Sequence, residues 1–303
     1  MSDAYLRFWG VRGSYAAPFA SHLGVGGNTS CVEIRVNDHI LVCDAGTGII
    51  SFGNEMMKQD KIRELMIVLT HYHWDHVCGL PFFVPAFMPD WKIRFFGPGQ
   101  DEDEIRKHVS AQMRAPYFPV GTESWLSDTT YLNPKKDRTL HYGPIEIRYD
   151  SVHHPGVTYG YRIKVNGKVV IYISDNECKF IEKSVTKRQG EFNEEETTLY
   201  NEMVQEEHQS ELDLIKNADI LIHDAQYTPE DYEKKRGWGH SCYIDTINMA
   251  IDAGVKELYL YHHDPYYNDD AIEVIYTHSN QIISERDTDM ICHIAREGMK
   301  IDL

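Results

Sequence analysis

Short runs of apolar residues that end abruptly in His or Asp recur along this chain. Runs of this length, rich in β-branched and aromatic side chains and bounded by polar residues, predict buried strands. Residues 66–70 lead into His71, residues 145–149 into His153 and His154, and residues 169–174 into Asp175. Residues 220–222 lead into His223 and Asp224, and residues 258–261 into His262 and His263. We expect the carboxyl ends of these strands to converge on one polar site.

The remaining periodicity predicts an α/β protein. Near the N-terminus, residues 5–9, 31–36 and 39–44 predict three antiparallel strands, with Asn37 and Asp38 supplying a turn. Apolar residues spaced three or four apart predict helices over residues 48–58, 101–114, 194–217, 243–253 and 270–286. Helices interleaved with strands in this way are typical of an α/β sandwich. No linker or low-complexity tract divides the sequence, so we expect a single domain over residues 1–303.

The composition is that of a folded protein, with 42% hydrophobic and 25% charged residues. The first residues lack the pattern of an export signal, and no apolar run reaches membrane-spanning length. We therefore expect a cytoplasmic protein without a membrane partner. The six cysteines are scattered without Cys-x-x-Cys pairs, which predicts reduced, buried thiols.

Charge narrows the expected substrate. Lys and Arg number 30 against 47 Asp and Glu, which gives a formal net charge of −17. A charge of this sign opposes long-range attraction to a polyphosphate backbone. We therefore expect a small-molecule substrate and not a large nucleic acid.

Two segments have an unusual composition that does not by itself indicate what they do. Residues 191–211 are strongly acidic, which predicts a helix with a solvated face and no catalytic part. Residues 82–125 are rich in aromatic residues and proline. They either line a substrate pocket or pack as ordinary core and loops, and the sequence leaves both interpretations open.

The densest cluster of metal-binding residue types is the segment His71-Tyr-His73-Trp-Asp75-His76, directly after a predicted strand. Imidazole nitrogens and carboxylate oxygens are the ligands that zinc and related divalent metals prefer. A short turn can aim alternating side chains at two neighbouring ions. The spacing therefore predicts a two-metal centre, and a cluster of surface histidines is the weaker explanation.

This segment resembles the His-x-His-x-Asp-His signature of the metallo-β-lactamase superfamily and matches it at every position. The resemblance implies an αββα sandwich of two mixed sheets with helices on the outer faces. It also implies two divalent metal ions, Zn²⁺ foremost with Mn²⁺ or Fe²⁺ as alternatives. In that superfamily pattern His71 and His73 bind the first metal, Asp75 and His76 bind the second, and Asp175 bridges them.

Each metal then needs one more histidine. By the resemblance the first is His154, which precedes Pro155, with His153 as the alternative. The second is His262, because aligning its strand with the Leu-Thr-His-Phe-Ser segment of the tRNA 3′-processing branch puts it on the ligand position. His263 is then either an outer residue that orients a neighbour or contacts substrate, or a packing residue.

Two later segments resemble the phosphodiesterase branch of the superfamily. Residues 221–225 (LIHDA) resemble its His-Glu-Ala-Thr element with Asp224 in place of glutamate, and residues 237–241 (GWGHS) resemble its Gly-His-Ser element. The resemblance implies that His240 protonates the leaving alkoxide and that Asp224 orients His240, while Asp75 helps to position the attacking water. Two cations do not protonate a leaving oxygen, so an imidazole acid suits this chemistry. The alternative is a structural histidine at the start of the next helix.

Substrate contacts are less well defined. The segments 8–14 and 26–30 resemble the entry strands of phosphodiesterases in this superfamily, and their glycines allow backbone amides to approach an anion. Asn28 and Thr29 are therefore candidate substrate-binding residues, together with His263. Tight turns explain the same glycines equally simply.

The interval between His154 and Asp175 is short and predicts only a strand pair around an Asn166-Gly167 turn, without the long basic arm of the tRNA-processing enzymes. The chain thus resembles the armless cyclic-nucleotide phosphodiesterases and the cyclic ribose phosphate phosphodiesterase. We expect a dinuclear phosphodiesterase acting on a small, cyclic ester. The alternatives are carboxyl-ester, lactone or β-lactam hydrolysis at the same centre and a non-catalytic nucleotide sensor. A homodimer is expected by family analogy alone.

Overall fold

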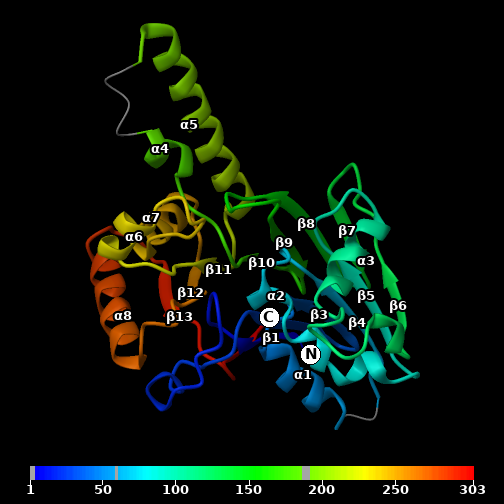
Figure 1. Cartoon of the computed structure of the whole chain (residues 1–303). Helices are drawn as coiled ribbons and strands as arrows, with labels where there is room; N and C mark the ends of the chain where they lie inside the picture. Colours follow the sequence, from blue (N-terminus) through cyan, green and yellow to red (C-terminus); the bar gives the residue numbers. More distant parts are fainter. Residues whose placement is uncertain (1–3, 59–60, 186–191) are drawn as a thin grey trace.

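Two sheets face each other in the computed structural model, with helices on their outer sides (Figure 1). The structure describes residues 4–58, 61–185 and 192–303. Within these residues, no helix combines the length and apolar character needed to span a bilayer.

The first sheet has the strand order β14-β1-β2-β3-β4-β5-β6. Its strands are β1 (Ala4–Gly10), β2 (Cys31–Val36), β3 (His39–Cys43), β4 (Glu64–Val68), β5 (Lys92–Phe96), β6 (Asp128–Tyr131) and β14 (Lys300–Asp302). The first three pair antiparallel, as the sequence predicts. From β3 to β6 the pairing is parallel, so the carboxyl ends of these strands share one edge.

The second sheet has the strand order β13-β12-β11-β10-β9-β8-β7. Its strands are β7 (Thr139–Tyr142), β8 (Ile145–Ser151), β9 (Tyr159–Val165), β10 (Lys168–Ile173), β11 (Ile220–Asp224), β12 (Glu257–Tyr261) and β13 (Ile291–Ile294). β9 and β10 form the expected hairpin, and Asn166 and Gly167 both take the positive φ angles that its two-residue turn requires. From β10 to β13 the pairing is parallel.

The central strands are buried on both faces, which explains why they read as continuous apolar runs. Along β3, Leu41 and Cys43 belong to the core between the sheets, while Ile40 and Val42 pack in a second core. Helix α1 contributes Phe52 to this second core. Rigid strands packed on both sides give the loops at their carboxyl ends fixed starting points.

Within the described residues, each helix predicted from the periodicity is present, with small differences at the ends, and three short α-helices are added. The helices are α1 (Gly48–Met56), α2 (Trp74–Val77), α3 (Glu102–Ala111), α4 (Phe180–Val185), α5 (Glu194–Ile215), α6 (Pro229–Lys235), α7 (Tyr243–Asp252) and α8 (Asp269–Ser284). The added ones, α2, α4 and α6, are too short for an apolar period to develop.

Helix α5 projects away from the body of the sandwich (Figure 1). It carries eight Asp and Glu residues and no Lys or Arg, and its outer turns are solvated as the sequence predicts. The base of α5 is not solvated, because Glu207 is buried there. Glu207 accepts the N–H of Ile181 at 3.0 Å and lies 3.1 Å from His153 Nε2. The prediction of a solvated face therefore fails at the base of α5, and residue 191 lies outside the described part of the chain.

Glu211, one turn beyond Glu207, supplies a test of this packing. Burial and the neighbouring Glu207 raise the pKa of Glu211 from 4.5 to about 7. Since the folded pKa is the higher one, the stabilisation is fully present below pH 4.5 and is lost as the pH rises through about 7. Glu211→Gln is therefore expected to gain in Tm relative to the wild type between pH 5 and pH 8, measured by thermal unfolding. The exposed Glu206→Gln is the control, and a Tm difference independent of pH would contradict the prediction.

Candidate metal centre

The His and Asp side chains identified from the sequence come from loops at the carboxyl ends of strands in both sheets. β4 leads through Thr70 into His71, and α2 carries Asp75 and His76. In the second sheet, β10 leads into Asp175 and β12 leads directly into His262. The centre therefore spans the two halves of the sandwich.

One cluster consists of His71, His73 and His154, with Asp175 beside it. His154 Nε2 lies 3.0 Å from His73 Nδ1. Asp175 Oδ2 lies 3.7 Å from the Nε2 atoms of both His71 and His154. The structure thus brings His154 to the cluster, whereas the ring of His153 lies against Glu207.

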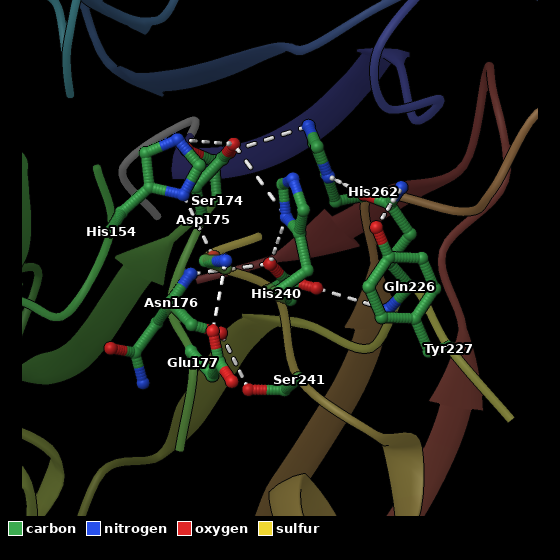
Figure 2. Close-up of polar contacts among 12 residues, drawn as sticks. His154, Ser174, Asp175, Asn176, Glu177, Gln226, Tyr227, His240, Ser241 and His262 are labelled. Carbon is green, nitrogen blue, oxygen red and sulfur yellow. Dashed lines mark hydrogen bonds and ion pairs between the residues drawn. The ribbon is translucent and has the colours of Figure 1, made fainter. Parts of the chain in front are cut away.

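A second cluster consists of Asp75, His76 and His262. His262 Nε2 lies 3.1 Å from Asp75 Oδ2 and 3.3 Å from Asp175 Oδ1. Asp175 therefore directs one carboxylate oxygen toward each cluster. Figure 2 shows its contacts with both His154 and His262. A carboxylate placed in this way is suited to bridge two ions.

The donor atoms of both clusters fit divalent cations. The Nε2 atoms of His71 and His76 and Oδ1 of Asp175 are buried and make no hydrogen bond of normal geometry, which is costly unless another partner satisfies them. Burial lowers the pKa of His71 well below its usual value, so its ring is neutral and keeps a lone pair. Burial alone would raise the pKa of Asp175, but the imidazoles of His262 and His76 lower it well below its usual value. Burial alone would lower the pKa of His76, but Asp175 and its neighbouring carboxylates raise it, so a cation bound there would take the place of a proton. Neutral imidazoles and ionised carboxylates are the forms that bind such metals.

Asp44 fixes the orientation of His76, a role that the sequence reasoning missed. Its Oδ2 accepts a hydrogen bond from His76 Nδ1 at 2.8 Å, and the hydroxyl of Tyr172 donates to the same oxygen at 2.8 Å. The N–H of Thr70 donates to Oδ1, also at 2.8 Å. With Nδ1 occupied, His76 presents Nε2 to the cluster, which is how outer partners set the tautomer of a metal-binding histidine.

Two other histidines are held in the same way. His262 Nδ1 lies 2.9 Å from Gln226 Oε1, and His154 Nδ1 lies 2.7 Å from the carbonyl oxygen of Gly239. Both contacts leave Nε2 directed into the centre. A glutamine or a backbone carbonyl leaves little trace in a sequence motif, so these partners become visible only in the fold.

His240 lies beside the clusters (Figure 2), and its ring contacts Asp224. Asp224 Oδ2 is 2.8 Å from His240 Nδ1, and Asp224 also accepts the N–H groups of Asn176 and Gln226. Burial raises the pKa of Asp224 and lowers the pKa of His240. Because Nδ1 faces Asp224, Nε2 is the ring nitrogen that can pass a proton to a bound substrate.

Glu177 holds the loop that carries His240. This buried carboxylate accepts the N–H of Gly237 at 3.0 Å, the N–H of Gly239 at 2.9 Å and the hydroxyl of Tyr232 at 2.7 Å. Gly237 and Gly239 both have positive φ angles, and a Cβ on Gly239 would approach His154 Nδ1 to 2.4 Å. Glu177 therefore sets the path of a loop that touches both His154 and the proton donor. No motif in the sequence marks it.

Glu177→Gln is expected to lower kcat for phosphodiester hydrolysis by about 10- to 100-fold with little change in KM. The amide offers one acceptor oxygen and turns its own N–H groups toward the loop N–H groups. The control is Glu230→Gln, an exposed glutamate on α6. Metal content should be retained while the pH profile of kcat shifts, and Tm should fall because buried donors lose their acceptor. An unchanged kcat and pH profile would remove the positioning role.

The candidate substrate-binding residues occupy structural positions. Asn28 Nδ2 donates to Glu297 at 3.1 Å, and Thr29 exchanges hydrogen bonds with Thr47. His263 is buried against the carbonyl of Ala295 at 3.0 Å, and burial lowers its pKa to about 3. The structure does not bring these side chains into the two clusters, so they support the surrounding loops.

Paired sheets with imidazole and carboxylate clusters at their strand ends define the class of metal-binding αββα sandwiches. The chain belongs to the beta-lactamase superfamily, because the model of the Beta-lactamase superfamily domain matches residues 39–194. Ribonuclease Z of Thermoplasma volcanium is 24% identical over 290 residues, which cover 87% of this chain and 88% of that protein.

Solved structures share the fold. The metallo-beta-lactamase fold protein YhfI of Bacillus subtilis has a TM-score of 0.66 at 17% identity and covers 99% of both chains. The short form of human tRNase Z has a TM-score of 0.59 at 17% identity and covers 98% of both chains. Together the matches confirm the superfamily, the αββα fold and the hydrolase class expected from the sequence.

The expectation that a large nucleic acid is an improbable partner is wrong, because the sequence relatives that span most of the chain are named ribonuclease Z. The expectation rested on the net charge of −17, which is a sum over the whole chain. Eight of the acidic residues stand on α5, which projects from the body of the molecule (Figure 1). Net charge is therefore a poor measure of the potential where substrate binds, and bound cations would add positive charge there.

Proposed function

We propose that this protein is a dinuclear metal-dependent phosphodiesterase that cleaves RNA. The observation that carries the proposal is the His240–Asp224 pair beside the two ligand clusters, because an acid at that position serves a phosphodiester with a poor leaving group. The names of the sequence relatives support RNA as the substrate.

The proposed division of labour follows from the ligand sets. His71, His73 and His154 would hold one ion, Asp75, His76 and His262 would hold the other, and Asp175 would contact both. When bound, two divalent cations supply an activated water nucleophile and neutralise charge on the phosphodiester oxygens. Asp75 orients the nucleophile, Asp224 holds His240, and His240 Nε2 delivers a proton to the departing oxygen.

A small, cyclic phosphodiester is the narrower alternative. It is supported by the interval between His154 and Asp175, which holds only β9 and β10 and no inserted arm. Ester, lactone or β-lactam hydrolysis would not need the acid at His240. Zn²⁺ as the native metal and the homodimer stay predictions.

The test is a substrate panel with the full chain loaded with Zn²⁺ or Mn²⁺. It compares a tRNA precursor, a short single-stranded RNA, cyclic mononucleotides, bis-p-nitrophenyl phosphate and a lactone. RNA should be cleaved with the highest kcat/KM. A higher kcat/KM for the cyclic nucleotides would favour the narrower alternative, and hydrolysis of the lactone alone would refute a phosphodiesterase.

A further inference from the structure

A cavity of about 440 Å³ opens beside the first ligand cluster, and its role is not explained by metal binding. His71 and His73 form one end of it. The rest of the wall comes from the loop before α3, from α3 itself and from residues 155–159. Part of the segment 82–125 therefore lines a pocket, which is one of the two interpretations that the sequence leaves open.

The walls of this cavity are aromatic and acidic. Tyr72, Tyr159 and His108 present rings to it, and the rings of Tyr72 and His108 stack with centroids 4.6 Å apart. Among the described residues that line the cavity there is no lysine or arginine, and its single carboxylate is Glu104. A wall of this kind repels a phosphate and favours a planar, uncharged group that can stack and donate N–H hydrogen bonds.

Glu104 is held in place for such a contact. Its Oε2 accepts the N–H of Gln100 at 2.7 Å, and its own N–H donates to Asp101 Oδ1 at 2.9 Å. His108 Nε2 lies 3.7 Å from Oε1. A carboxylate has about four acceptor positions, so these contacts leave acceptors on both oxygens for a ligand.

The cavity lies on the side of the centre away from the acid. The ring of His154 contacts His73, which lines the cavity, and also His240, which does not. A group in the cavity therefore belongs to the part of the substrate that keeps the phosphate, since His240 protonates the part that leaves.

We propose that this cavity binds a nucleobase of the RNA substrate and that Glu104 selects guanine. Guanine presents two adjacent N–H donors, N1–H and the 2-amino group, which match the two oxygens of one carboxylate. Adenine places a lone pair at N1, and uracil flanks its single N–H with two carbonyls, so both are repelled by a carboxylate. The proposal rests on the proposed function only in naming RNA as the source of the base.

Nucleoside binding tests the proposal without depending on turnover. Calorimetric titration of the metal-loaded full chain should show guanosine binding at least about 10-fold more tightly than adenosine, with inosine, which lacks the 2-amino group, in between. Glu104→Gln should abolish this order. The matched control is Glu102→Gln, an exposed glutamate on the same helix that does not line the cavity. Equal binding of guanosine and adenosine, or an order unchanged in Glu104→Gln, would overturn the inference.

Cleavage of dinucleotides separates failure of the inference from failure of the function. With guanine or adenine on either side of the phosphate, the guanine preference should appear only for the nucleoside that keeps the phosphate. Cleavage without any base preference would support the phosphodiesterase function and contradict the assignment of the cavity as a guanine site. Guanosine binding that depends on Glu104, without cleavage of any dinucleotide or RNA, would support the guanine site and contradict the proposed function.

Discussion

Replacing His240 with alanine should lower the rate of RNA hydrolysis by about 10²- to 10⁴-fold while both metals stay bound. The two proposed ligand sets, His71, His73 and His154 and then Asp75, His76 and His262, do not include this ring. The ribose oxygen is a poor leaving group and departs slowly without a proton. Asp224 contacts His240 Nδ1 at 2.8 Å and holds the ring so that Nε2 can donate a proton. The loss of rate in His240→Ala therefore reports the loss of this proton donor. The measurement is kcat/KM together with metal content by elemental analysis.

The leaving group supplies an internal control for His240. A p-nitrophenolate leaves readily without protonation, so His240→Ala should affect bis-p-nitrophenyl phosphate much less than RNA. The exposed His141→Ala should affect neither. Equal losses on both substrates would indicate that His240 has a structural role or binds metal, and full activity on RNA would remove the acid assignment.

Asp175→Asn should lower hydrolysis by about 10³-fold or more and reduce the metal content from two ions to at most one. An amide has one oxygen and turns an NH₂ group toward one of the clusters, so it cannot serve both. Removing an ion that stabilises developing charge is worth several kcal/mol, which corresponds to a loss of this size. Metal stoichiometry and kcat are the measurements.

The exposed Asp289→Asn serves as the control for Asp175→Asn and should keep two metals and full activity. Two ions bound in Asp175→Asn at wild-type affinity would show that this residue does not bridge. Loss of both ions would show that the clusters depend on each other.

Much of the fold could be read from the sequence, because the strands buried on both faces produce continuous apolar runs that end where the chain reaches the site. The ligands of the His71–His76 segment share one turn, so their spacing alone predicts the cluster. Asp44 follows the same rule, since it comes directly after the apolar run of β3, and that signal could have identified it.

Other features depend on contacts that no local pattern encodes. Glu177 binds a loop 60 residues further along the chain, and Gln226, which follows β11, contacts His262 at the end of the neighbouring strand β12. Which of His153 and His154 faces the metal centre depends on Glu207 at the base of α5. Glu207 lies 3.1 Å from the ring of His153 and holds it away from the centre. These partners are set by the packing of separate elements.

The expectation that excluded a large nucleic acid failed for a different reason. A net charge adds all residues with equal weight, although the field at a site depends on distance and burial. An acidic helix that points away from the centre contributes much to the sum and little to the local potential. In the guanine pocket proposed beside Glu104, local acidity would even serve recognition, because the recognised group is a base and not a phosphate.

Gly239 leaves no space for a side chain against His154 and Pro155, with contacts of 2.4 and 2.3 Å to the position of a Cβ. The loop that carries His154 and the loop that carries Gly239 and His240 therefore have complementary shapes, although 85 residues separate the contacting groups in the chain. A chimera that imports either loop alone from a homologue should misplace a ligand, whereas exchanging both together should preserve it. Attempts to redirect this scaffold toward new substrates have more freedom at α3, whose residues can vary without disturbing that fit.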